Sequence, residues 1–193
     1  MSKRILLLFA VMFLWVSGAQ ATPIFYSATL SGAAENPSNG SPGTGFAIVG
    51  FDPIAQTLSV DVTFSGLLGP TTASHIHCCV DPPGNVGVAT SLPTFTGFPS
   101  GVTAGTYSHL FDLTLASSFS PSFVTANGGT LAGAEAALED GLANGRAYLN
   151  IHTTTYPGGE IRGFLASVPE PATLSLLVVG LGMLVLLRRK RCV

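Results

Sequence analysis

A strict alternation of apolar and polar residues, with a period of two, marks the middle of the chain. From Leu58 to Phe64 every second side chain is apolar, and the side chains between them are serine, aspartate or threonine. Successive side chains of a strand point to opposite faces, so this pattern predicts a strand with one buried face. Similar short segments recur between clusters of turn residues. The seven predicted strands are 24–31, 45–51, 57–65, 73–78, 107–115, 146–152 and 160–165.

One segment follows the helical period instead. Between Leu131 and Leu142, apolar side chains recur every three or four residues. Thr130 is a suitable cap for the amino end of this helix, and Asn144-Gly145 is a stop signal. The helix is expected to bury its apolar stripe and to turn its acidic side chains to water. These acidic residues are Glu135, Glu139 and Asp140.

Seven strands and a single helix predict a mainly β domain. Antiparallel sheets with one solvated face bury their apolar faces against each other. The pattern therefore favours an antiparallel Greek-key β-sandwich with one helical insertion, and a closed barrel is the alternative. Residues 22–167 are enough for one such domain and too few for two.

The amino terminus has the three parts of an export signal. Lys3 and Arg4 precede an apolar run over residues 5–16, and small residues follow up to Ala21. A basic region, a hydrophobic region and a small-residue cleavage site are typical of a secretory signal peptide. We therefore expect signal peptidase to remove residues 1–21. A permanent amino-terminal anchor is the alternative.

The carboxyl terminus also has three parts. Pro169-Glu170-Pro171 precedes an apolar run over residues 172–187, which ends in a basic cluster. Sixteen helical residues span about 24 Å, which is close to the thickness of a bilayer core, so the run predicts a transmembrane helix. The basic cluster places the end of that helix in the cytoplasm. It consists of Arg188, Arg189, Lys190 and Arg191.

Residues 168–193 together resemble the PEP-CTERM sorting signal of Gram-negative bacteria that make exopolysaccharide. The resemblance implies that an exosortase in the inner membrane recognises Pro169-Glu170-Pro171 and removes the hydrophobic tail. The ectodomain, residues 22–167, is then expected to pass from a transient anchor in the inner membrane to the extracellular matrix or cell envelope. The alternative is a plain single-pass membrane anchor.

Charge limits the partners of the ectodomain. Residues 22–167 contain two basic side chains, Arg146 and Arg162, against nine acidic ones, because the other six basic residues lie in the two targeting ends. Nucleic acid is excluded as a partner, since its phosphates demand a basic surface. The expected partners are signal peptidase and exosortase during processing, the membrane before processing, and exopolysaccharide or other envelope proteins afterwards.

Six short motifs follow one another in a fixed order along the ectodomain. They are Ser31-Gly32-Ala33-Ala34-Glu35-Asn36-Pro37, Gly43-Thr44-Gly45, Phe64-Ser65-Gly66-Leu67, Ser74-His75-Ile76-His77, Tyr148-Leu149-Asn150-Ile151-His152-Thr153 and Pro157-Gly158-Gly159-Glu160-Ile161-Arg162-Gly163. This series resembles the CHRD domain, a module named for chordin and found in many secreted bacterial proteins. The resemblance runs over most of residues 24–166 and implies an extracellular domain of poorly defined molecular function.

Two histidine segments carry the candidate chemistry of the chain. In a strand, His75 and His77 share one face, and His152 lies in a similar setting further along. If the two strands are neighbours, three imidazoles converge, which is the smallest protein donor set for a zinc or copper site with an open position. The candidates for a carboxylate partner are Asp81 and Glu160. The alternative is that these histidines only hydrogen-bond to backbone or carboxylates and fix strand ends.

The adjacent Cys78 and Cys79 are a departure from the CHRD pattern. In an oxidising compartment they lack a third partner, because Cys192 lies beyond the apolar tail. Three states are open, namely a vicinal disulfide that bends the strand, two free thiols, or intermolecular links within a matrix. Adjacent Cα atoms lie about 3.8 Å apart, below the usual disulfide range of about 4.4–6.8 Å. We favour the vicinal disulfide.

The sequence contains no nucleophile elbow, phosphate-binding loop or zinc protease motif. The leading interpretation is therefore a non-enzymatic structural or binding module of the exopolysaccharide matrix or cell envelope, without a cofactor. The second is an extracellular protein that binds zinc or copper through His75, His77 and His152. The third is an adhesin whose loop 84–105 presents Phe95 and Phe98 to a ligand.

Overall fold

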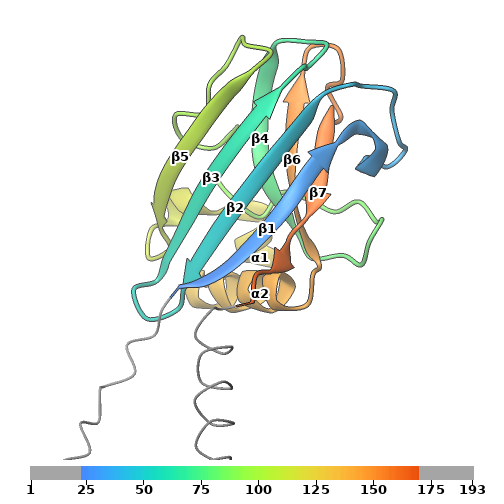
Figure 1. The fold of residues 1–193 in the computed structure, drawn as a ribbon. Coiled ribbons are helices and arrows are strands. Elements are labelled where there is room, and N and C mark those ends of the chain that lie inside the picture. Colours follow the sequence, from blue (N-terminus) through green and yellow to red (C-terminus); the bar gives the residue numbers. More distant parts are fainter. Residues whose placement is uncertain (1–22, 170–193) are drawn as a thin grey trace, which may run out of the picture.

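The structure, a computed structural model, describes residues 23–169, which form a tall antiparallel sheet with two helices at one end (Figure 1). The strands are β1 (Ile24–Ser31), β2 (Thr44–Asp52), β3 (Thr57–Ser65), β4 (Thr71–Cys78), β5 (Gly105–Asp112), β6 (Ala147–Thr153), β7 (Ile161–Phe164) and β8 (Ala166–Ser167). The helices are α1 (Pro121–Ala126) and α2 (Leu131–Ala143), and single 3-10 turns form at η1 (Gly32–Ala34) and η2 (Ala116–Ser118).

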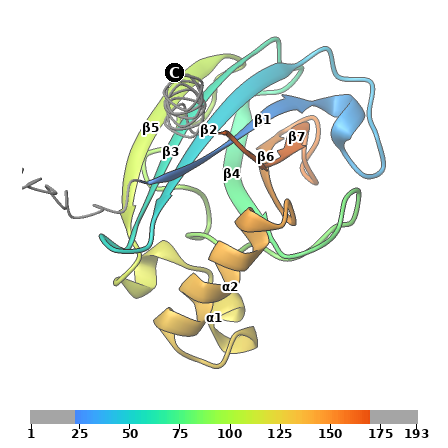
Figure 2. The same ribbon diagram turned by 60° about the horizontal axis from the view of Figure 1, so that its bottom comes forward.

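All the strands belong to one continuous sheet. Its order is β4-β6-β7-β1-β2-β3-β5, and β8 also pairs with β1. The sheet curls, so its β4–β6 end turns toward β2 and β3 (Figure 2). The two separate sheets expected of a Greek-key sandwich are thus two halves of one sheet, because β7 and β8 both hydrogen-bond to β1 and the strand twist accumulates across the join. Within residues 23–169 no pairing joins β4 to β5, so the barrel is not closed either.

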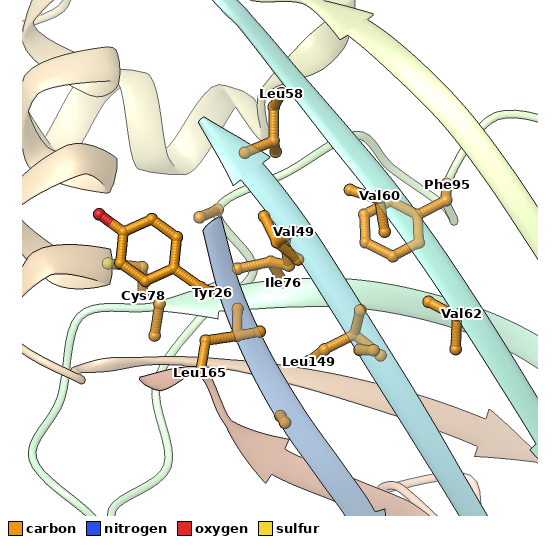
Figure 3. Packing of buried hydrophobic residues seen from close by; sticks show 14 of the residues in the cluster. Tyr26, Val49, Leu58, Val60, Val62, Ile76, Cys78, Phe95, Leu149 and Leu165 are labelled. Atoms are coloured by element: carbon orange, nitrogen blue, oxygen red, sulfur yellow. The ribbon is translucent and has the colours of Figure 1, made fainter. Parts of the chain in front are cut away.

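The core lies between the two halves of the curled sheet. Val49, Ile76 and Leu149 come from β2, β4 and β6 and approach one another there (Figure 3), and none of them is exposed to solvent. The alternation predicted for β3 is confirmed, because its apolar side chains are buried while Asp61 faces solvent. Burial of these apolar faces is the main source of stability for the curl.

The predicted strand boundaries agree closely with the structure, and one difference has a clear cause. β1 and β3 begin and end where the pattern predicts. β5 ends at Asp112, three residues before the predicted end at Leu115. The carboxylate of Asp112 accepts hydrogen bonds from the backbone N–H and the hydroxyl of Thr114, at 2.9 and 2.6 Å, and so turns the chain away from the sheet.

Helix α2 was predicted, whereas α1 was not. The Thr130 hydroxyl accepts a hydrogen bond from the backbone N–H of Gly133, which confirms the predicted cap. Glu135 was expected to face water but is 9 % exposed, because its carboxylate accepts a hydrogen bond of 2.8 Å from the Gln56 amide of a neighbouring turn. α1 is a second helical element after Pro121, and its six residues are too few to show a helical period.

The pair Cys78 and Cys79 lies at the end of β4, against helix α2. The structure joins their sulfur atoms. Both sulfurs point toward the Ala137 carbonyl of α2, and Gly141 is the helix residue beside them. A Cβ atom at position 141 would collide with both sulfurs, so the absence of a side chain there makes room for the pair.

The targeting ends lie outside the described residues. This applies to the predicted signal peptide, to Glu170 and Pro171 of the sorting motif, to the apolar run 172–187 and to the basic cluster. Among residues 23–169, no helix has the length and apolar character needed to cross a membrane.

We predict that Cys78 and Cys79 are joined in the exported protein. In a strain without exosortase the exported chain should keep its tail and therefore all three cysteines. Alkylation without reduction should then label Cys192 alone, and alkylation after reduction should label all three. Intact-mass spectrometry measures both states. Labels on Cys78 and Cys79 in the unreduced protein would contradict the disulfide, and a disulfide-linked dimer would favour intermolecular links instead.

We also predict that Leu149→Ala destabilises the domain by about 2–5 kcal/mol, because it leaves a cavity between the two halves of the sheet. The matched control is Leu110→Ala on β5. Leu110 is 63 % exposed, so its loss should change the free energy of unfolding by less than about 0.5 kcal/mol. Urea unfolding measures both variants. Equal stabilities for the two would show that the core does not lie where the curl places it.

Candidate metal centre

Strands β4 and β6 are neighbours, as the metal hypothesis requires. His75 is paired with Asn150, and Ala73 with His152, in an antiparallel register. Side chains alternate along both strands, so Ile76 and Ile151 enter the core while the three histidines lie on the opposite face. The fold therefore brings together side chains that are 75 residues apart in the sequence, because of the register between β4 and β6.

The three imidazoles form a compact cluster. One ring nitrogen of each histidine lies within 4.8 Å of the corresponding nitrogens of the other two. The ring centres are 5.3 Å apart for His75 and His152, 5.9 Å for His75 and His77, and 6.1 Å for His77 and His152. His75 and His77 are buried, and His152 is half-buried. These distances place three candidate ligand atoms around one point.

Each ring is held by a hydrogen bond to a backbone carbonyl from a loop. His75 bonds through Nε2 to Pro93 at 2.7 Å, His77 through Nδ1 to Val86 at 2.8 Å, and His152 through Nδ1 to Pro157 at 2.9 Å. A carbonyl oxygen only accepts, so the bonded nitrogen of each neutral ring carries the proton. The opposite nitrogen of each ring consequently carries a lone pair.

The three lone-pair nitrogens are buried and have no hydrogen-bond partner among residues 23–169. They are Nδ1 of His75, Nε2 of His77 and Nε2 of His152. An unsatisfied buried polar atom costs about 1–3 kcal/mol, and here three acceptors with no donor between them lie together. This arrangement is the one that a cation bound by all three rings would satisfy.

The cluster favours neutral imidazole rings. Burial lowers the pKa of all three histidines below the ordinary value, opposed in each by the hydrogen bond to the carbonyl. For His77 the pKa falls to about 4. At neutral pH, protons therefore compete weakly with a metal ion for these nitrogens.

The donor set suits a zinc or copper ion. Imidazole nitrogen is a common ligand of both metals, and a backbone carbonyl that accepts the other ring N–H is the usual outer partner of a metal-bound histidine. His75, His77 and His152 would hold the ion, and three protein ligands would leave one position for water or another small ligand. The residues present thus fit the zinc or copper ion of the second hypothesis drawn from the sequence.

The two carboxylates considered as outer partners lie elsewhere. Glu160 is fully buried and accepts hydrogen bonds from Ser41, Thr153 and the backbone of Leu68 and Gly69, which lower its pKa against the effect of burial. Asp81 is exposed and forms a surface ion pair of 3.4 Å with Arg146. Neither bonds to a histidine, so loop carbonyls take the role proposed for them.

The structure corrects the hypothesis of an adhesin loop that presents Phe95 and Phe98 to a ligand. Phe95 and Phe98 in the loop after β4 are 0 % and 7 % exposed, so they belong to the core and do not present a binding surface. Phe95 stacks on Tyr107 of β5 with ring centres 5.7 Å apart. The fourth histidine, His109, is also on β5 and lies against Phe111, outside the cluster.

A buried ion pair borders the cluster, and sequence reasoning did not place it there. Arg162 on β7 is 1 % exposed and lies 3.8 Å from the Glu35 carboxylate. Burial raises the pKa of Glu35 to about 7, and the arginine only partly opposes this rise. Asn150, which is paired with His75 across the strands, donates to the same carboxylate at 3.3 Å. The scarcity of basic residues was the only sequence signal that pointed to Arg162.

Comparison with known proteins supports the two resemblances drawn from the motifs. The CHRD domain family matches residues 26–165, and the PEP-CTERM protein-sorting motif matches residues 167–191. No curated protein and no solved structure matches the chain. The sorting motif implies processing by an exosortase, with export and membrane anchoring before sorting to the cell envelope. Because the CHRD match covers most of the chain, including both histidine segments, the protein belongs to the CHRD domain family.

Proposed function

We propose that this protein is an exported metal-binding protein that holds one zinc or copper ion through His75, His77 and His152. The observation that supports it best is the convergence of three buried ring nitrogens whose lone pairs have no partner. A histidine that only fixed a strand end would need one hydrogen bond and no particular direction for its second nitrogen. Here the second nitrogen of every ring is buried without a partner among the described residues, and the three rings bring candidate ligand atoms within 4.8 Å of one another.

Energetics also favour an ion over an empty cluster. The loop carbonyls fix all three N–H groups, so the rings cannot satisfy one another without breaking one of those bonds. An unsatisfied buried acceptor costs about 1–3 kcal/mol, and the described protein atoms supply no donor to any of these three. A bound ion removes this cost and gains coordination bonds, so metal binding is expected to stabilise the fold.

For the cell, we propose a structural or binding role without catalysis in the exopolysaccharide matrix or cell envelope. The sorting motif supports an extracytoplasmic destination. The acidic ectodomain and its many serine and threonine residues suit a hydrated, polysaccharide-rich environment. The CHRD family is not a known enzyme family. In this proposal the metal has a structural role, since its three ligands join β4 to β6 beside the loops that orient the rings. Exopolysaccharide and other envelope proteins are the proposed partners.

The full chain, purified in detergent without a histidine tag, should bind one equivalent of zinc or copper after metal exposure and dialysis. His77→Ala and His152→Ala should each weaken binding by more than about 100-fold, since the loss of an outer partner alone costs about 10–100-fold. Metal analysis and competition with a chelator measure this. His109→Ala is the control and should bind normally. Metal-free wild-type protein, or equal loss in the control, would overturn the proposed site.

Sorting can be tested with an epitope placed immediately before Val168. We expect the tagged ectodomain to leave the inner membrane without its apolar tail, and to keep that tail in a strain without exosortase. Cell fractionation with mass analysis of the tagged fragment measures both. If the tagged protein stays in the inner membrane with an intact tail in both strains, it is a plain membrane anchor.

A further inference from the structure

The loop that orients His77 is not held by strand pairing alone. Val86, whose carbonyl accepts from His77, follows the turn Pro83-Gly84-Asn85. Within this turn the residues are exposed or half-buried, and few apolar contacts are available to fix them. Something else must place the Val86 carbonyl 2.8 Å from the ring nitrogen of His77.

The Arg162 guanidinium forms hydrogen bonds to all three residues of this turn. It donates to the carbonyl of Pro83 at 2.8 Å, to the carbonyl of Gly84 at 3.4 Å and to the side-chain oxygen of Asn85 at 2.5 Å. Its Nε–H donates to the carbonyl of Ala34 at 2.6 Å. Three successive residues of the turn are thus bonded to one planar group, which fixes the turn relative to the sheet.

A second contact leads from Arg162 to the same histidine. The guanidinium lies over the ring of Tyr148, 4.7 Å from its centre, and His77 also lies against that ring. The rings of Tyr148 and His77 are stacked, with centres 4.7 Å apart and planes within 4°. The Tyr148 hydroxyl also bonds to the backbone of Val86 at 3.3 Å. Arg162 is therefore linked to His77 in two indirect ways. It bonds to the turn that precedes the Val86 acceptor, and it packs on Tyr148, which stacks on the His77 ring.

We propose that Arg162 is a positioning residue of the metal centre, which it serves through the Pro83–Val86 turn and through the ring of Tyr148. This inference rests on the proposed function. Arg162 touches neither the ion nor a ligand nitrogen. It keeps the Nε2 lone pair of His77 directed at the other two histidines. Because the ring is already ordered, metal binding does not have to supply the free energy of ordering it. Metal binding and the hold on the turn are then coupled in both directions.

The test uses the full chain and zinc. Arg162→Lys keeps the charge but replaces a planar group of five N–H donors with three donors on one nitrogen, so it cannot make all four bonds of the arginine. It should weaken zinc binding by about 10–100-fold. Replacement of the buried Arg162 also affects folding, so Asn85→Ala is the second variant. Asn85 is exposed, and its loss removes the bond of its Oδ1 to the guanidinium and the bond that its Nδ2 donates to the Asn36 carbonyl. We expect about 10-fold weaker zinc binding for it.

Two comparisons separate positioning from general loss of stability. Asn85→Asp retains the acceptor oxygen, so at high salt, where its added charge is screened, it should keep nearly wild-type affinity. Asn144→Ala removes an exposed amide that bonds to Asp140 at the end of α2, far along the chain from the turn, and should bind zinc normally. Chelator competition measures each affinity, and circular dichroism shows that each variant is folded.

The outcomes distinguish this inference from the proposed function. Weaker binding by Asn85→Ala together with recovery in Asn85→Asp supports positioning by Arg162. If wild type binds zinc and Asn85→Ala binds it equally well, or if Asn85→Asp is as weak as Asn85→Ala, the positioning role is wrong while the metal centre stands. If wild type binds neither zinc nor copper, the proposed function and this inference are both overturned.

Discussion

The direction of three lone pairs depends on three hydrogen bonds to backbone carbonyls. Because a carbonyl oxygen cannot donate, each bond places the proton on one ring nitrogen and leaves the other as a bare acceptor. The acceptors are Pro93, Val86 and Pro157, which lie in loops rather than in the strands that carry the rings. The geometry of the cluster is therefore a joint product of the sheet, which supplies the rings, and of the loops, which rotate them.

The curled sheet supplies the stability that offsets the burial of these polar rings. One face of β4 and β6 packs into the core, where Ile76, Leu149 and Ile151 are fully buried. The hydrophobic burial on that face offsets the cost of partly buried polar groups on the other. The histidine face is covered by loops and not by a second apolar layer, so loop carbonyls accept from the three rings and the Glu35 carboxylate accepts from Asn150.

Local patterns predicted the strands well because a period of two is visible in a single segment. β3 and helix α2 both follow patterns that their own residues determine, and both lie where the sequence places them. The pairing of β4 with β6 is different, since it depends on how the whole sheet curls. The sequence offered it only as a condition for the metal site. The loop acceptors were out of reach, because any residue has a carbonyl and no side-chain pattern marks which one will bond.

The same distinction explains why the sequence, which offered Glu35 as one of several ion-pair partners of Arg162, could not place this pair beside the histidines. A buried arginine needs acceptors for a planar group of five N–H donors. Here four hydrogen bonds join Arg162 to Ala34, Pro83, Gly84 and Asn85, which lie in two separate loops. With its donors directed at these oxygens, the guanidinium is left 3.8 Å from Glu35 without a direct hydrogen bond.

This explains two features that at first disagree, an ion pair and a carboxyl group whose pKa is raised to about 7. The arginine charge is close enough to lower the pKa of Glu35, yet too weakly coupled to overcome the burial of that carboxyl. Its principal bonds go to the loops. A lysine at this position would supply the charge for Glu35 but not the planar set of donors, so the identity of Arg162 follows from its hold on the loops more than from its charge.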